Sequence, residues 1–188
     1  MRGVLALIFV AIWASSISVV AEQPEEPVEV ETEEWQRIDS RYCTIWIDPA
    51  LKAESVNRRI SVWQIQPVVK VLPGAGVEEE LAAKFDTIFW KAQELLDMYP
   101  PGIHVTIRVA KEQEKIGAVH HARYGFGTSA VAFYVFENNT VYAVGRELSE
   151  SVLVHEMAHC IMDHYFAVRP PRKVEEMLAI YTDEHLRD

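Results

Sequence analysis

Apolar residues recur at two spacings along the chain, and these spacings predict both strands and helices. The alternating spacing that is typical of strands occurs over residues 42–47, 103–110, 129–136 and 140–144. The spacing of three and four residues that is typical of amphipathic helices occurs over residues 77–98, 149–162 and 173–186, and more weakly over 50–61 and 111–123. The residues around Glu137 predict a hairpin between the last two strands. The pattern therefore predicts an α+β fold with a small mixed sheet.

The N-terminus has the pattern of a secretory signal peptide. Arg2 precedes an uncharged apolar run over residues 4–20, and the small residue Ala21 fits a cleavage site. An N-terminal membrane anchor is the alternative, although a run of about 17 residues is at the short limit for spanning a bilayer. Cleavage after Ala21 implies export to the periplasm or the extracellular space. No second apolar run is long enough to span, so the mature chain is expected to have no membrane span.

The segment after the signal peptide, residues 22–40, is acidic, carries prolines and lacks periodicity. This composition predicts a flexible leader, so the domain proper is expected over residues 41–188. The whole chain has 28 acidic and 18 basic residues, a balance that argues against a nucleic-acid partner. Cys43 and Cys160 lack metal-ligand spacing, and the sequence leaves open whether they are two buried thiols or a disulfide.

The strongest chemical signal is the run His155-Glu156-Met157-Ala158-His159, which has the form H-E-x-x-H. Residues four apart on a helix lie on the same face, so both imidazoles can bind one metal ion. Ser149 is a suitable N-cap for that helix, and its apolar faces predict that it is at least half buried. Buried histidines need partners, and a metal ion provides one. Two histidines hydrogen-bonded in the core are the alternative.

A catalytic zinc site usually has three protein ligands and one open position, so a third ligand is needed. His164 has the wrong spacing for the longer H-E-x-x-H-x-x-G-x-x-H pattern, because Met162 and Tyr165 occupy the positions of its glycine and histidine. Glu175 and Glu176 are better candidates, because they begin a second helix that can fold back on the first. Spacing alone does not choose between these two glutamates.

The H-E-x-x-H run together with Glu176-Met177-Leu178-Ala179 resembles the gluzincins. These are H-E-x-x-H zinc metallopeptidases whose third ligand is a glutamate on a second helix, often in an E-x-x-A context. The resemblance spans roughly residues 100–186 and implies a compact zincin-like fold. In this fold a hairpin strand borders the cleft, and the helix with the two histidines precedes the helix with the ligand glutamate. It also implies that His155, His159 and Glu176 bind one Zn²⁺ per chain.

The same resemblance implies that Glu156 is the general base of peptide hydrolysis, taking a proton from the activated water and returning it to the leaving amine. The expected function is that of an exported zinc metallopeptidase acting on a peptide or protein substrate. Larger gluzincins have a tyrosine or histidine that stabilises the oxyanion, and the nearby candidates here are Tyr165, Tyr181 and His185. The alternative is a non-catalytic peptide- or partner-binding protein that retains its metal.

We predict one zinc ion per mature chain, because two histidines and one glutamate make a single site. His155→Ala and His159→Ala should each abolish zinc binding, as measured by metal analysis of the purified protein. Stoichiometric zinc in the double variant would contradict the site.

Overall fold

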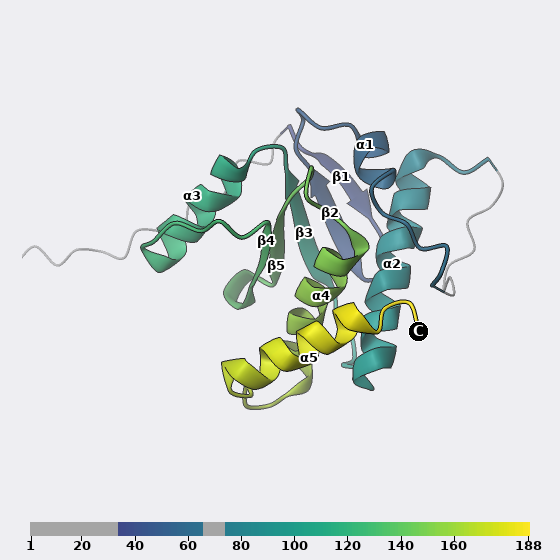
Figure 1. The fold of residues 1–188 in the computed structure, drawn as a ribbon. Coiled ribbons are helices and arrows are strands. Elements are labelled where there is room, and N and C mark those ends of the chain that lie inside the picture. The colour runs from purple at the N-terminus through teal and green to yellow at the C-terminus, as the bar shows by residue number, and fades with distance from the viewer. Residues whose placement is uncertain (1–33, 66–73) are drawn as a thin grey trace, which may run out of the picture.

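The computed structural model of the protein describes residues 34–65 and 74–188. These residues form five strands and five α-helices (Figure 1). The elements, in chain order, are β1 (Gln36–Asp39), β2 (Cys43–Ile47), α1 (Ala53–Asn57), α2 (Val77–Leu96), β3 (Val105–Ala110), α3 (Gln113–Tyr124), β4 (Ala132–Val135), β5 (Thr140–Val144), α4 (Glu150–Tyr165) and α5 (Arg172–Glu184). A short 3-10 helix, Phe136–Asn138, connects β4 to β5. The fold is therefore α+β, as the sequence predicts.

The strands form one mixed sheet in the order β1-β2-β3-β5-β4. The three inner strands are parallel, with Ile45 of β2 beside Ile107 of β3, and Ile107 beside Val141 of β5. Both edge strands are antiparallel to their neighbours. All five residues of β5 are buried, as expected for an inner strand that is covered on both faces.

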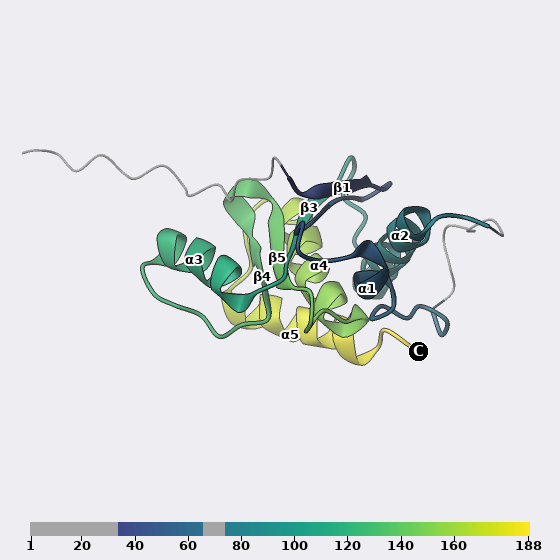
Figure 2. The same ribbon diagram turned by 90° about the horizontal axis from the view of Figure 1, so that it is seen from above.

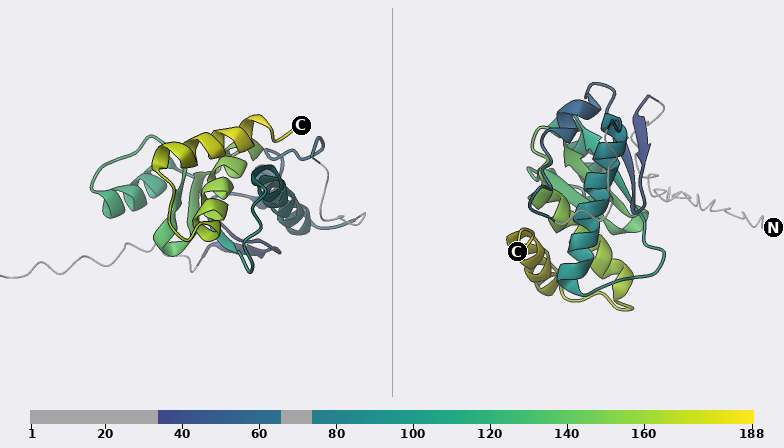
Figure 3. Two further views of the ribbon diagram at one scale, coloured as in Figure 1. Left: turned by 90° about the horizontal axis from the view of Figure 1, so that it is seen from below. Right: turned by 90° about the vertical axis from the view of Figure 1, so that its right-hand side faces the viewer.

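Two hydrophobic clusters cover the two faces of the sheet. The larger cluster lies between the sheet and α1, α2 and α4, and it includes Val141 and Ala143 of β5. The smaller cluster lies on the other face, where Tyr142 and Val144 of β5 pack with residues of α3 and with Trp35. Figures 2 and 3 show α3 beside β4 and β5, apart from the other helices. Because side chains alternate along a strand, β5 contributes to both clusters.

The structure confirms the predicted strands and helices to within a few residues at their ends, including the β4–β5 hairpin. It corrects the leader assignment, because β1 lies inside the segment 22–40 that the sequence predicts to be flexible. Gln36–Asp39 pairs with Ile47–Thr44 of β2, and Trp35 is buried in the smaller cluster. Residues 1–21 and 22–33, to which the sequence assigns the signal peptide and most of the leader, lie outside the described residues.

A buried carboxylate connects β2 to α3. Asp48, which follows β2, has no exposed surface, and its Oδ2 lies 2.7 Å from Lys115 Nζ of α3. The backbone N–H groups of Ala50 and Lys111 also donate to this carboxylate. Burial raises the pKa of Asp48, but the hydrogen bonds from Lys115 and the two backbone groups more than offset it, so the pKa is below its ordinary value of 3.8.

Within residues 34–65 and 74–188, no helix combines the length and the apolar character needed to cross a membrane.

We predict that Asp48→Asn lowers the free energy of unfolding by about 1–3 kcal/mol at neutral pH, because Lys115 and two backbone donors lose a charged acceptor. The lowered pKa of Asp48 means that its stabilisation is present above pH 3.8 and is lost as the pH falls below that value. The variant should therefore lose less stability than the wild type on acidification, as measured by urea denaturation at several pH values. Asp39→Asn is the control, since Asp39 is an exposed strand carboxylate paired with Arg37, and it should change little.

Candidate metal centre

Helix α4 carries the H-E-x-x-H run at the boundary between core and solvent. The helix begins where the Ser149 Oγ accepts a hydrogen bond from the backbone N–H of Val152, which confirms the predicted N-cap. Its apolar face is fully buried, with Leu153, Met157 and Ile161 in the larger hydrophobic cluster. The side chains of His155 and His159 are partly exposed, at 25% and 15%, and their ring centroids are 5.1 Å apart. The two imidazoles therefore share one face of α4, accessible from outside.

Helix α5 packs on α4 and directs Glu176 toward the two histidines. The Oε2 atom of Glu176 lies 3.7 Å from His155 Nε2 and 3.8 Å from His159 Nε2. Both distances are too long for direct hydrogen bonds. They are close to the separation of about 3.4 Å between two ligand atoms of a tetrahedral zinc ion with bonds of about 2.0–2.1 Å. One ligand atom from each residue lies within 4.8 Å of the others, so this donor set fits a metal ion.

The protonation state of His159 also suits metal binding. Burial, followed by the proximity of His155, lowers the pKa of His159 to about 4. At neutral pH the ring is therefore uncharged, and its proximity to Glu176 is not an ion pair. A neutral imidazole has a free nitrogen lone pair, which is the form that coordinates a metal.

Glu156 lies between α4 and the edge strand β4. Burial raises the pKa of its carboxyl, a hydrogen bond from the backbone N–H of Tyr134 opposes the shift, and the nearby Glu176 adds to it, so that the pKa is about 7. A carboxyl with a pKa near 7 can hold or release a proton close to neutral pH. This is the property that a general base at this position needs.

A charged group with two buried carboxylates lies at the connection between α4 and α5. The carboxylate of Asp163, near the end of α4, is 1% exposed and lies 2.7 Å from Arg169 Nε in the connecting segment. Glu175 at the start of α5 lies 3.4 Å from the same nitrogen, and the Arg169 guanidinium also stacks on Phe136. Glu175 is thus directed to Arg169, while Glu176 is directed to the histidines. Burial, with the neighbouring Glu175, raises the pKa of Asp163, although Arg169 opposes the shift.

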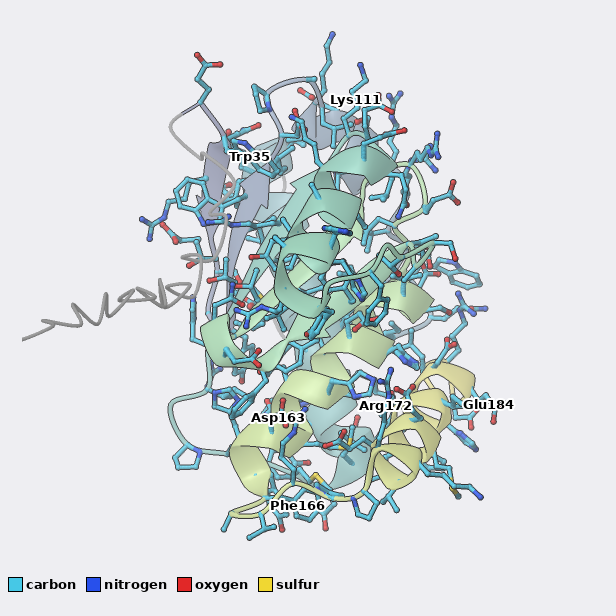
Figure 4. The ribbon with its side chains drawn as sticks, turned by 90° about the vertical axis from the view of Figure 1, so that its left-hand side faces the viewer. Trp35, Lys111, Asp163, Phe166, Arg172 and Glu184 are labelled. Carbon is cyan, nitrogen blue, oxygen red and sulfur yellow. The ribbon has the colours of Figure 1, made fainter. Side chains whose placement is uncertain are left out.

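The structure adds Arg172, which the sequence reasoning missed. Its Nε lies 3.5 Å from Oε1 of Glu176, the oxygen that does not approach the histidines. Figure 4 shows Arg172 at the start of α5, in the region between α5 and α4. Arg172 is largely exposed, so this is a weak surface ion pair on the side of Glu176 away from the imidazoles. The only sequence signal is the i, i+4 spacing of an arginine and a glutamate, which is common on helices.

The other residues considered from the sequence lie elsewhere. The Nδ1 of His164 is 2.9 Å from the Cys160 carbonyl, and His164 is not part of the group that could hold a metal ion. Tyr165 packs on Phe166, and Tyr181 stacks on His185. Among the described residues, none of the three oxyanion candidates makes a hydrogen bond, an ion pair or a ring contact with His155, His159 or Glu176. Cys43 and Cys160 are both buried and free.

Comparisons of this chain with protein-family models, with curated proteins and with solved structures find no match.

We predict that Glu176→Gln lowers zinc affinity by more than about 100-fold, whereas Glu175→Gln leaves it nearly unchanged. Only Glu176 approaches the histidine nitrogens, and removing even an outer partner of a metal ligand typically costs about 10–100-fold. Competition with a chromophoric chelator measures both affinities. The opposite result would assign the ligand to Glu175, and equal affinities would exclude both glutamates.

Proposed function

We propose that the protein is a zinc-dependent metallopeptidase with a compact, zincin-like fold of the gluzincin type. The observation that carries this proposal is the convergence of His155 Nε2, His159 Nε2 and Glu176 Oε2 beside the carboxyl of Glu156. Two histidines and a glutamate are one of the usual ligand sets of catalytic zinc. The order of elements, with an edge-strand hairpin, then the histidine helix, then the glutamate helix, agrees with the resemblance found in the sequence.

A zinc ion held by these three residues would supply Lewis-acid polarisation of a substrate carbonyl and would lower the pKa of a coordinated water to about 7. The chain supplies the remaining functions. Glu156 accepts a proton and returns it to the leaving amine, and its raised pKa suits both transfers near neutral pH. Arg172 pairs with the outer oxygen of Glu176, and burial keeps His159 neutral near pH 7.

The open edge of β4 offers a place for an extended peptide. Strand β4 is the last in the sheet, and the backbone N–H of Val144 donates to Val131, just before β4. In an antiparallel ladder, hydrogen-bonded residue pairs alternate with pairs that are not hydrogen-bonded, so every second residue of β4 bonds to β5. Ala132 and Tyr134 therefore direct their backbone groups away from β5, which agrees with the hydrogen bond between the Tyr134 N–H and Glu156.

A peptide added to this edge as a further strand would pass directly by Glu156. The proposed substrate is thus an extended segment of a peptide or protein, bound through its main chain. Export through the N-terminal segment remains part of the proposal and rests on the sequence of residues 1–21 alone.

We predict that Glu156→Gln retains zinc and stability but loses peptide hydrolysis by about 10²–10⁴-fold, the usual contribution of general acid–base catalysis. Cleavage of a quenched fluorescent peptide library, before and after treatment with a chelator, measures the activity. Glu147→Gln, an exposed carboxylate paired with Arg146, is the control and should keep full activity.

Hydrolysis that is absent in the zinc-loaded wild type would favour the alternative, a metal-retaining binding protein. Hydrolysis at equal rates in the wild type and in Glu156→Gln would require a different base.

A further inference from the structure

The side of α5 that faces away from α4 carries four large exposed apolar residues, which are called the outer row here: Val174, Met177, Ile180 and Tyr181. Met177 is 61% exposed, Ile180 is 47% exposed, and Val174 and Tyr181 are each 42% exposed. Single exposed apolar residues are common, but a group of neighbours on one helix face is typical of an interaction site. The opposite face of α5 is buried through Glu175, Ala179 and Thr182, so the helix is firmly packed and its outer row is available. Figure 3 shows α5 on the outside of the molecule, over α4.

Opposite charges stand at the two ends of this row. Lys173 precedes it and Glu184 follows it, and both side chains are exposed. They are separated by about three helical turns, so Lys173, Met177, Ile180 and Glu184 lie along one side of the helix. Among the described residues, neither Lys173 nor Glu184 takes part in an ion pair or a side-chain hydrogen bond. The row is therefore basic at its start, apolar in the middle and acidic at its end.

This pattern is complementary to itself when reversed. Two copies of α5 packed antiparallel about a two-fold axis place Lys173 of each copy opposite Glu184 of the other, and Met177 opposite Ile180. A two-fold interface uses the same patch on both copies, so a self-complementary patch is what it requires. A parallel arrangement would instead place like charges together, which is unfavourable. We propose that the protein forms a homodimer through the outer face of α5, with the two helices antiparallel.

The charge of α5 argues against a membrane surface as the occupant. The helix carries Glu175, Glu176, Asp183 and Glu184 against Arg172 and Lys173, and the whole chain has a net charge of −10. Anionic lipid surfaces attract helices with a basic polar face. Dimerisation through the outer row also leaves Glu176 directed to the histidines, so it does not depend on the proposed activity.

The expected dimer is weak and depends on concentration. A helix of this length is about 20 Å long, and contacts of this size fall at the low end of protein interfaces, below about 1,200 Å². Sedimentation equilibrium of the purified mature protein, from micromolar to near-millimolar concentration, is therefore the suitable measurement.

The charge pair provides the decisive test. Lys173→Glu and Glu184→Lys should each weaken the dimer by about 5-fold or more, because each creates two like-charge contacts. The double variant with both changes should restore the dimer. Met177→Glu should abolish it, whereas Val168→Glu, at a position that is 84% exposed but outside α5, should have no effect. Circular dichroism confirms that each variant is folded.

Several outcomes would overturn the proposal. These are a wild type that is monomeric at every concentration, a dimer that survives Met177→Glu, and a double charge variant that fails to recover. A monomeric wild type that binds neutral phosphatidylcholine vesicles, with binding lost in Met177→Glu, would assign the same row to a lipid surface instead.

Discussion

The packing of α5 against α4 is the constraint on which the candidate centre depends. The two histidines are a property of one helix, but they converge with a third donor only because α5 returns across α4 at a fixed position. At this return the buried carboxylate of Asp163 pairs with the half-exposed guanidinium of Arg169, and Glu175 lies close to the same guanidinium. An unpaired carboxylate at this depth would be costly, so the ion pair favours the observed arrangement of the connection.

Partial burial explains the opposite pKa shifts in the centre. Removing a group from water disfavours its charged form, so the pKa of His159 falls to about 4 and the pKa of Glu156 rises to about 7. Burial therefore favours the neutral form of both His159 and Glu156. A pair of groups shifted in this way is typical of sites that bind metals or transfer protons, although buried structural networks produce shifts too.

The sheet contributes an exposed edge next to the candidate centre. Strand β4 is the final strand, and its outward backbone groups lie beside the carboxyl of Glu156. Strand β5 is buried on both faces and holds β4 in register, while α3 and Trp35 cover the face opposite α4. The edge strand and the candidate metal centre are therefore adjacent, because α4 packs beneath the β4–β5 hairpin.

The sequence by itself determined the local features. Helical spacing fixed the common face of His155 and His159, Ser149 marked the start of their helix, and alternation located β2, β3, β4 and β5. It could not identify β1, because Gln36–Asp39 has little apolar alternation and becomes a strand only by pairing with β2. Spacing alone also left Glu175 and Glu176 equivalent, and only the resemblance to the gluzincins favoured Glu176. Adjacent residues on a helix differ by about 100° in direction, so only the packing of α5 decides which carboxylate faces the histidines and which faces Arg169.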